Sequence, residues 1–369
     1  MKILSAALAC LLPLALQASP FGYERVRVAE GIYAFIETPG HAVVSGNSIA
    51  IVGDDDVAVV DTGQHPELTR RMIAEIRALT AKPVRYVINT HWHNDHVAGN
   101  ALYAEAFPGA RFIAHEFTAR VMDTDIRAFQ GPQCQSFLRV QSKALRDALA
   151  SGTALDGKPL SDERRARYTR VLVDADAAIE ECLQFRYRGA DETFSDRLTL
   201  RLGNRDVQVM FLGRANTAGD AVVLVPDAKV LMTGDILVHP FPFALQSYPG
   251  EWAAVLRRID AIDATAIVPG HGPVMRDRAY LREIAALMES VDAQVRKAYH
   301  PGMALEDVRK QVDLAAFRAR IAGDDAVIGA NFDAMVTGSA VARAYQAAKG
   351  TMEPEGLPKT RATRSSRGN

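Results

Sequence analysis

The sequence predicts an α+β protein to which long helical segments have been added. Short runs rich in β-branched residues alternate with stretches of helical periodicity in much of the chain. Several of these runs end in loops that carry His or Asp beside Gly, which places polar side chains together at one edge of a sheet. The segments at about 117–187 and 276–349 are helical in texture and break this alternation.

The composition is that of a globular protein with a balanced charge. The chain has 369 residues, 43 basic and 44 acidic side chains, and a formal net charge of −1. Hydrophobic residues make up 48%, which is sufficient for a large core. The balance of charge argues against nucleic-acid binding, so the expected partner is a small-molecule substrate. The oligomeric state cannot be read from the sequence.

Residues 1–18 predict a signal peptide. The chain begins with Met1-Lys2, continues through an apolar run from Ile3 to Leu16, and offers the small residue Ala18 near a cleavage point. The run is shorter than a membrane span and Pro13 interrupts it, so cleavage is favoured over a retained anchor. We therefore expect a periplasmic or secreted protein without a stable membrane span.

Export gives the cysteines a structural role. When Cys10 leaves with the signal peptide, Cys134 and Cys182 remain as an even pair in an oxidising compartment. The sequence predicts that they form a disulfide, which contributes roughly 4 kcal/mol on the chain-entropy model. The alternative is two buried free thiols.

The mature chain divides into a core at 19–275, a helical extension at 276–349 and a tail at 350–369 that is predicted to be disordered. Helices are expected from about 66 to 79, where Met72, Ile73, Ile76 and Leu79 have helical spacing, from near Asp95, and from about 251 to 262. Strands are predicted at 26–28, 32–36, 48–52, 57–60, 84–89, 110–114, 198–202, 207–212, 221–225, 230–232 and 266–268.

The segment His91-Trp92-His93-Asn94-Asp95-His96 carries the strongest chemical signal. Three imidazoles and a carboxylate this close together are the ligands that zinc prefers, and one ion takes four. The segment can therefore begin two metal sites. Two later strands also end in ligand residues, in Thr233-Gly234-Asp235 and in Pro269-Gly270-His271-Gly272.

Together with the segment 213–220, which reads Gly-Arg-Ala-Asn-Thr-Ala-Gly-Asp, these motifs resemble the metallo-β-lactamase superfamily over residues 25 to 275. The resemblance implies a four-layer αββα sandwich with a binuclear metal site at one edge. It assigns His91 and His93 to the first metal, Asp95, His96 and His271 to the second, and Asp235 to a bridging position. It also implies that Asp61 supports the ligand loop from behind.

One ligand position departs from the family pattern. Where the family commonly has a histidine, this chain has Asn216, whose amide oxygen is a poorer zinc ligand than imidazole. Asn216 coordinates weakly, or the first metal is absent, or hydrolysis has been lost. The sequence thus predicts one complete zinc site at Asp95, His96, Asp235 and His271, and a second that is one imidazole short. His41 and His239 are expected to be ordinary loop histidines.

The function implied by the resemblance is zinc-dependent hydrolysis, in which a metal-bound hydroxide attacks an activated carbonyl of a β-lactam, lactone or ester. Asp95 and Asp235 are the candidate catalytic residues: Asp95 orients the water, and Asp235 holds the metal. Phe241, Phe243, Leu245 and Tyr248 either line the substrate or pack their own loop. The alternatives are a metal-binding or ligand-binding protein with weak or lost catalysis, and an adaptor that docks a partner through 117–187.

Overall fold

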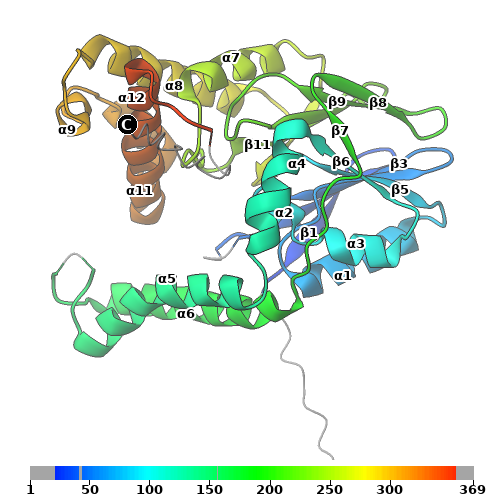
Figure 1. Ribbon diagram of the computed structural model, residues 1–369, viewed down its shortest axis with the longest axis horizontal. Helices are drawn as coiled ribbons and strands as arrows, with labels where there is room; N and C mark the ends of the chain where they lie inside the picture. The colour runs from blue at the N-terminus through cyan, green and yellow to red at the C-terminus, as the bar shows by residue number, and fades with distance from the viewer. Residues whose placement is uncertain (1–20, 41–43, 156, 355–369) are drawn as a thin grey trace, which may run out of the picture.

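The computed structural model describes residues 21–40, 44–155 and 157–354. The predicted signal peptide and most of the predicted disordered tail lie outside these residues. Within them, the strands form two sheets that pack face to face, with helices on the outer faces (Figure 1). The four-layer αββα fold expected from the sequence is confirmed.

The first sheet contains the N-terminal half of the core. Its order is β1-β2-β3-β4-β5-β6-β7, antiparallel as far as β4 and parallel from there on. Its strands are β1 Tyr23–Ala29, β2 Ile32–Glu37, β3 Ser48–Val52, β4 Val57–Val60, β5 Val84–Asn89, β6 Arg111–His115 and β7 Glu192–Phe194. Helices α1 Pro66–Leu79 and α3 Asn100–Ala106 cover its outer face, where Met72, Ile76 and Tyr103 are buried.

The second sheet completes the sandwich. Its order is β12-β11-β10-β9-β8, and the pair β11–β12 is parallel. Its strands are β8 Arg197–Arg201, β9 Asp206–Phe211, β10 Ala221–Val225, β11 Val230–Val238 and β12 Ala266–His271. Helices α7 Pro249–Asp260 and α8 Ala279–Ala298 cover its outer face. Alternate side chains of the two sheets, among them Ile51, Ile88 and Val223, meet in the core between them.

The insertion forms a helical hairpin. Figure 1 shows α5 (Pro132–Ser151) and α6 (Asp162–Glu181) side by side, projecting beyond the sheets. The predicted disulfide is present: Cys134 and Cys182 have their Cα atoms 5.7 Å apart and join the start of α5 to the end of α6. The hairpin follows α4 Glu116–Val121 and a π-helix at Met122–Ile126, and a 3-10 turn at Cys182–Gln184 ends it.

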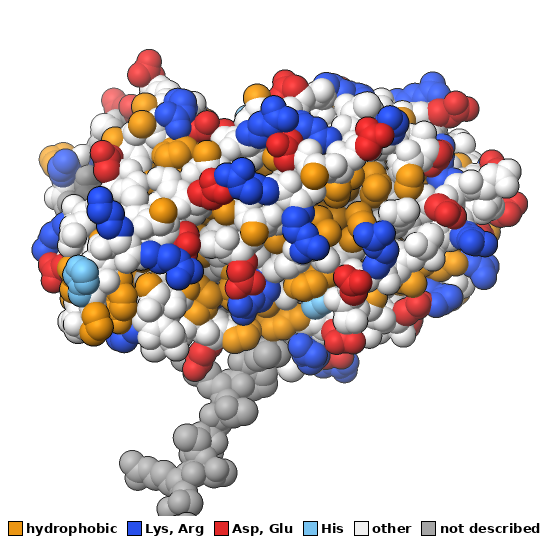
Figure 2. Space-filling view, turned by 90° about the horizontal axis from the view of Figure 1, so that it is seen from above, with side chains coloured by type: hydrophobic (Ala, Val, Ile, Leu, Met, Phe, Trp, Pro, Cys, Tyr) orange, Lys and Arg blue, Asp and Glu red, His pale blue; other side chains and the backbone are white. Residues whose placement is uncertain are grey.

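The C-terminal extension packs against α7 and α8. After α8 it contains α9 Leu305–Arg309, α10 Ala315–Ala322, α11 Ala326–Phe332, a π-helix at Asp333–Ala340 and α12 Val341–Lys349. None of the helices in the described ranges is long and apolar enough to span a bilayer. The face in Figure 2 intersperses basic and acidic side chains, as the balanced charge leads one to expect.

The structure differs from the sequence-based expectation in local details. The three-residue strand β7 was not predicted, because so short a run has no readable alternation. The helix expected from near Asp95 is the short α2 Asn94–Val97, separated from α3 by Ala98 and Gly99. At Gly99 the backbone lies directly against another segment, since a Cβ there would overlap the Thr62 carbonyl oxygen. This close approach requires glycine at the break between the two helices.

Candidate metal centre

The sequence-predicted ligands lie at one edge of the sandwich. His91 and His93 follow β5, and Asp95 and His96 belong to α2. Asp235 lies within β11 and His271 ends β12. The β11–β12 register is interrupted at Gly234, whose φ of 50° lies in the left-handed region, and this irregularity redirects Asp235.

In the predicted complete site, each of the two imidazoles lies close to both carboxylates. His271 Nε2 lies 3.0 Å from Asp95 Oδ2 and 3.5 Å from Asp235 Oδ1. His96 Nε2 lies 3.1 Å from Asp235 Oδ1 and 3.4 Å from Asp95 Oδ2. The donor atoms of Asp95, His96 and His271 therefore form a group compact enough to hold one ion.

A second group forms around the other oxygen of Asp235. His91 Nε2 lies 3.5 Å from Asp235 Oδ2, and His93 Nδ1 lies 3.9 Å from the same oxygen. The two imidazole nitrogens are 2.9 Å apart. Asp235 thus faces both groups, as the bridging position requires.

Three of the four imidazoles have a hydrogen-bonding partner on the ring nitrogen that faces away from the centre. His96 Nδ1 lies 2.8 Å from Asp61 Oδ2, His91 Nδ1 lies 3.0 Å from Thr90 Oγ1, and His93 Nε2 lies 3.1 Å from Gln246 Oε1. For the fourth, His271 Nδ1 faces Glu37 Oε2 at 3.6 Å. Such contacts fix ring orientation and tautomer. The sequence pointed to Asp61 but not to Gln246 or Glu37.

Asp61 holds its position through several contacts at once. Its carboxylate also accepts hydrogen bonds from the backbone N–H of Thr90 at 2.8 Å and from the Thr90 hydroxyl at 2.7 Å. Its φ of 56° is unusual for a residue that is not glycine. A strained backbone conformation of this kind persists only where surrounding contacts hold the residue in place. Asp61 therefore orients both His96 and the strand end that precedes His91.

The electrostatics of the centre favour a cation. Burial opposes ionisation of Asp95 and Asp235, yet the neighbouring histidines hold the pKa of both carboxyls well below its usual range. Burial likewise lowers the pKa of His271, but Asp235, Asp95 and Glu37 together raise it to about 10. Burial and the adjacent His96 lower the pKa of His91 to about 4. Protons on histidine thus balance buried carboxylates where a metal ion would otherwise do so.

Buried polar atoms without a hydrogen-bond partner also indicate a cation site. His96 Nε2, Asp235 Oδ1 and Asn216 Oδ1 are buried, and among the described residues none has a partner in hydrogen-bond geometry. Buried polar atoms are nearly always paired, and each unpaired one requires an explanation. A metal ion provides that explanation for an imidazole nitrogen and a carboxylate oxygen that face each other. The residues present therefore fit zinc.

Comparison with known proteins agrees with this geometry. A model of the metallo-beta-lactamase superfamily matches residues 41–271, a span that includes every ligand named above. The chain belongs to the metallo-β-lactamase superfamily. A linear primary-alkylsulfatase from Pseudomonas sp. (strain ATCC 19151) is 24% identical over 284 residues, which cover 72% of this chain and 50% of the relative. The chain thus spans about half the length of the curated relative it matches.

Solved structures of similar fold include a metallo-beta-lactamase from Pontibacter korlensis, at 18% identity and a TM-score of 0.49 over 72% of this chain and 99% of that one. The DIM-1 metallo-beta-lactamase is similar at 17% identity and a TM-score of 0.49, over 73% of this chain and 98% of that one.

Asn216, which stands where the superfamily resemblance implies a histidine, is held in a defined orientation. Its side chain is buried, and its Nδ2 donates to the carbonyl oxygen of Phe243. The surrounding turn is fixed by Asp220, which accepts hydrogen bonds from Thr217 N at 2.7 Å and Ala215 N at 3.2 Å. Because the amide nitrogen is engaged, the amide oxygen is the atom left without a partner.

The loop 239–248 packs part of its side chains into the core and places Phe243 beside a ligand. Tyr248 is 1% exposed and belongs to a core cluster, so its role is packing. The ring of Phe243 lies 5.7 Å from that of His93, edge to face, and Leu245 is 48% exposed. His239 packs against Tyr280, and its ring belongs to neither ligand group among the described residues. His41 lies outside the described residues.

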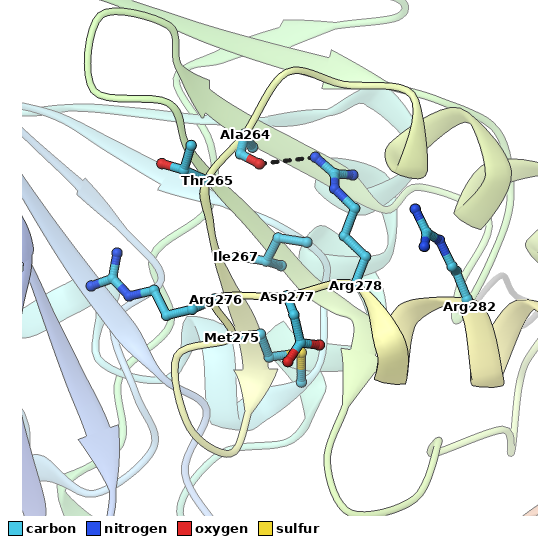
Figure 3. Close-up of a pocket in the computed structure, with 8 residues that line it drawn as sticks. All are labelled: Ala264, Thr265, Ile267, Met275, Arg276, Asp277, Arg278 and Arg282. Carbon is cyan, nitrogen blue, oxygen red and sulfur yellow. Dashed lines mark hydrogen bonds between the residues drawn. The ribbon is translucent and has the colours of Figure 1, made fainter.

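A cavity of about 270 Å³ lies at the other end of β12 (Figure 3). It is lined by Ala264, Thr265, Ile267, Met275, Arg276, Asp277, Arg278 and Arg282. Arg278 donates to the carbonyl oxygens of Ile262 at 2.6 Å and Ala264 at 2.9 Å, and so closes the turn after α7. None of the residues that line the cavity is a metal ligand, and the hydrogen bonds of Arg278 stabilise the turn after α7.

Proposed function

We propose that this chain is an exported, zinc-dependent hydrolase acting on an activated carbonyl such as that of a β-lactam, lactone or ester. The observation that carries the proposal is the convergence of Asp95, His96, Asp235 and His271, with buried donor atoms left unpaired between them. Family membership supports the reaction class. The start of the sequence supports export.

Asp95, His96, Asp235 and His271 would hold one zinc ion, and His91 and His93 would begin a second site. Zinc supplies a Lewis acid for the carbonyl oxygen and lowers the pKa of water to about 7. The remaining chemistry is that of the side chains. The imidazoles are oriented by the groups behind them, and the buried carboxylate of Asp235 balances charge.

The two aspartates differ in access to solvent, which supports different roles. The side chain of Asp95 is 17% exposed, whereas that of Asp235 is 4% exposed. Asp95 can therefore contact substrate or water, orient the attacking water and accept its proton. Asp235 is enclosed between the two ligand groups and serves to hold them together.

Among the three alternatives for Asn216, the hydrogen bond to Phe243 supports coordination through oxygen. The carbonyl of Phe243 accepts only from the amide nitrogen, so the orientation with oxygen on that side is excluded. We propose that His91, His93 and Asn216 together form a weak first metal site. An amide oxygen carries no charge and is a poorer zinc ligand than imidazole, so this ion should be lost first.

Sulfate-ester hydrolysis is a second candidate, favoured by the alkylsulfatase relative. Exposed apolar side chains on two loops support a substrate with an alkyl chain: Val44 is 42% exposed and Leu245 is 48% exposed. Gly46, two residues after Val44, lies against His96, and Gln246, next to Leu245, contacts His93. Both loops thus border the ligands.

The decisive experiment combines metal analysis with a substrate panel. Purified mature protein is analysed for zinc and assayed with nitrocefin, a lactone, an aryl ester and a linear alkyl sulfate. Asp95→Ala should lose turnover of whichever substrate is cleaved. Zinc bound without turnover of any substrate would favour a binding protein. No zinc after gentle purification would contradict the hydrolase.

Variants of Asn216 test the first site separately. Asn216→His should raise the zinc content without lowering hydrolysis, and Asn216→Asp should strengthen binding through a charged oxygen. Asn216→Ala should leave one ion per chain. Equal metal content in all three would contradict coordination by Asn216. Export is tested by the N-terminal sequence of protein recovered from the periplasm or medium, which should begin close to Ser19.

A further inference from the structure

The hairpin of α5 and α6 presents apolar side chains to solvent. Phe137 and Val140 on α5 are 50% and 69% exposed, and Val173 on α6 is 56% exposed. Large apolar side chains exposed on a projecting element are candidates for an interaction surface. The hairpin packs its own two helices against each other and projects from the sheets (Figure 1), which leaves its outer surface open.

The base of the hairpin is held firmly to the core. His65 Nδ1, at the start of α1, lies 2.6 Å from Glu181 Oε2 at the end of α6. The Arg70 guanidinium donates to Gln184 Oε1 at 3.1 Å, and the disulfide joins the two helices at the same level. The exposed surface is therefore presented in a fixed position, which lowers the entropic cost of binding.

The charges of α6 divide into two halves around Val173. After the acidic first turn of Asp162 and Glu163, the arginines Arg164, Arg165, Arg167 and Arg170 precede Val173. The acids Asp174, Asp176, Glu180 and Glu181 follow it; of these, Asp174 is buried and Glu181 contacts His65, so Asp176 and Glu180 are the exposed ones. Arg170 and Asp176 lie three residues on either side of Val173, and both are exposed. Asp176 has an exposed contact with Arg146, which contributes little to stability.

We propose that α6 pairs with α6 of a second copy of this chain, antiparallel, about a two-fold axis close to Val173. This arrangement places Arg170 of each copy opposite Asp176 of the other. It also brings the arginines that precede Val173 in each α6 towards Asp176 and Glu180 of the other copy. Two antiparallel hairpins that meet in this way form a four-helix arrangement, which buries Val173 of both copies between them.

The charge pattern is what selects a second copy as the occupant. A two-fold contact uses the same residues on both sides, so a surface must be complementary to itself. A segment whose charges reverse sign about its midpoint has this property. A uniformly acidic or basic partner would be attracted to one half of α6 and repelled by the other.

Charge reversal tests the pairing directly, on full mature protein by analytical ultracentrifugation. The wild type should sediment as a dimer. Arg170→Glu and Asp176→Arg should each weaken self-association by roughly tenfold or more, because like charges then face each other at two places. Mixing the two variants should restore a dimer, since each altered side chain then meets an opposite charge.

Two controls keep the result unambiguous. Arg201→Glu, an exposed charge on β8, should remain dimeric. Val173→Cys should form a covalent dimer on mild oxidation, whereas Arg201→Cys should not. A monomeric wild type at high concentration would overturn the proposal. So would a dimer that neither charge reversal weakens, or a mixture of the two variants that stays monomeric.

Discussion

Asn47 forms hydrogen bonds with the backbone on both sides of His271. Its Nδ2 donates to the carbonyl oxygens of Pro269 and Gly272, each at 2.9 Å, and its backbone N–H donates to Gly270 O at 2.7 Å. Asn47 is 1% exposed. The segment between β2 and β3 thereby fixes a ligand that lies more than two hundred residues later in the chain.

Asn47→Ala should loosen His271 and lower zinc content. The substitution removes the side-chain donor from the buried carbonyl oxygen of Pro269 and the partly buried one of Gly272, and leaving a buried acceptor unpaired costs about 1–3 kcal/mol. We expect a lower melting temperature and a weaker zinc affinity of the metal-free protein on titration. Asn204→Ala, at an exposed position between β8 and β9, is the matched control. Unchanged zinc affinity in Asn47→Ala would show that His271 is held by other contacts.

Gly46 is required because its backbone lies directly against a ligand. A Cβ at this position would overlap the ring of His96, and the Gly46 N–H donates to Asp95 O at 3.0 Å. Gly46→Ala must therefore displace His96 or the loop, and we expect reduced zinc content and reduced turnover together. Gly109→Ala has no atom near its Cβ and should behave as wild type. Normal zinc content in Gly46→Ala would mean that the loop moves away instead.

The sequence predicted those parts of the site that are local or follow from strand order. His91 to His96 are neighbours in the chain, and Asp235 and His271 belong to the neighbouring strands β11 and β12, Asp235 at the register interruption of β11 and His271 at the end of β12. Glu37, Gln246 and Asn47 could not be predicted in this way. Glu37 ends β2, whereas Asn47 and Gln246 come from segments without periodicity, and the contacts of all three with the ligands arise only when the sheets pack. For Asn216, the sequence left three alternatives, whereas the structure adds the orientation of the amide.

Zinc binding should release protons over a wide pH range. In the metal-free protein the pKa of His271 is raised to about 10, so this imidazole is charged at neutral pH and must lose its proton to bind zinc. The sign follows from the raised pKa. Stabilisation of the metal-free fold by this charge is complete below about pH 6.5 and is lost as the pH rises through about 10.

Calorimetry of zinc binding in buffers of different ionisation enthalpy measures the protons released. At about pH 8 at least one proton should be released per zinc bound, and apparent affinity should rise about tenfold per pH unit for each proton. Glu37→Gln removes one of the carboxylates that raise the pKa of His271, so it should reduce proton release at about pH 9. Zinc binding with no proton release at about pH 8 would exclude a charged His271.

The C-terminal extension supports the group of His91 and His93 through Arg343. This buried guanidinium on α12 donates to Ser247 O at 2.9 Å and Gln246 O at 3.4 Å. Gln246 in turn contacts His93. Arg343→Met keeps the apolar stem of the side chain but removes the donors that hold this loop.

We expect Arg343→Met to lower the occupancy of the first zinc site and raise KM, while the site at Asp95, His96, Asp235 and His271 keeps its metal. Loss of charged hydrogen bonds to buried carbonyls should also reduce stability by about 2 kcal/mol. Arg309→Met provides the control, because Arg309 donates to Gly338 O within the extension, away from the loop. If both variants lower stability and neither changes metal content or KM, the extension stabilises the fold without orienting His93.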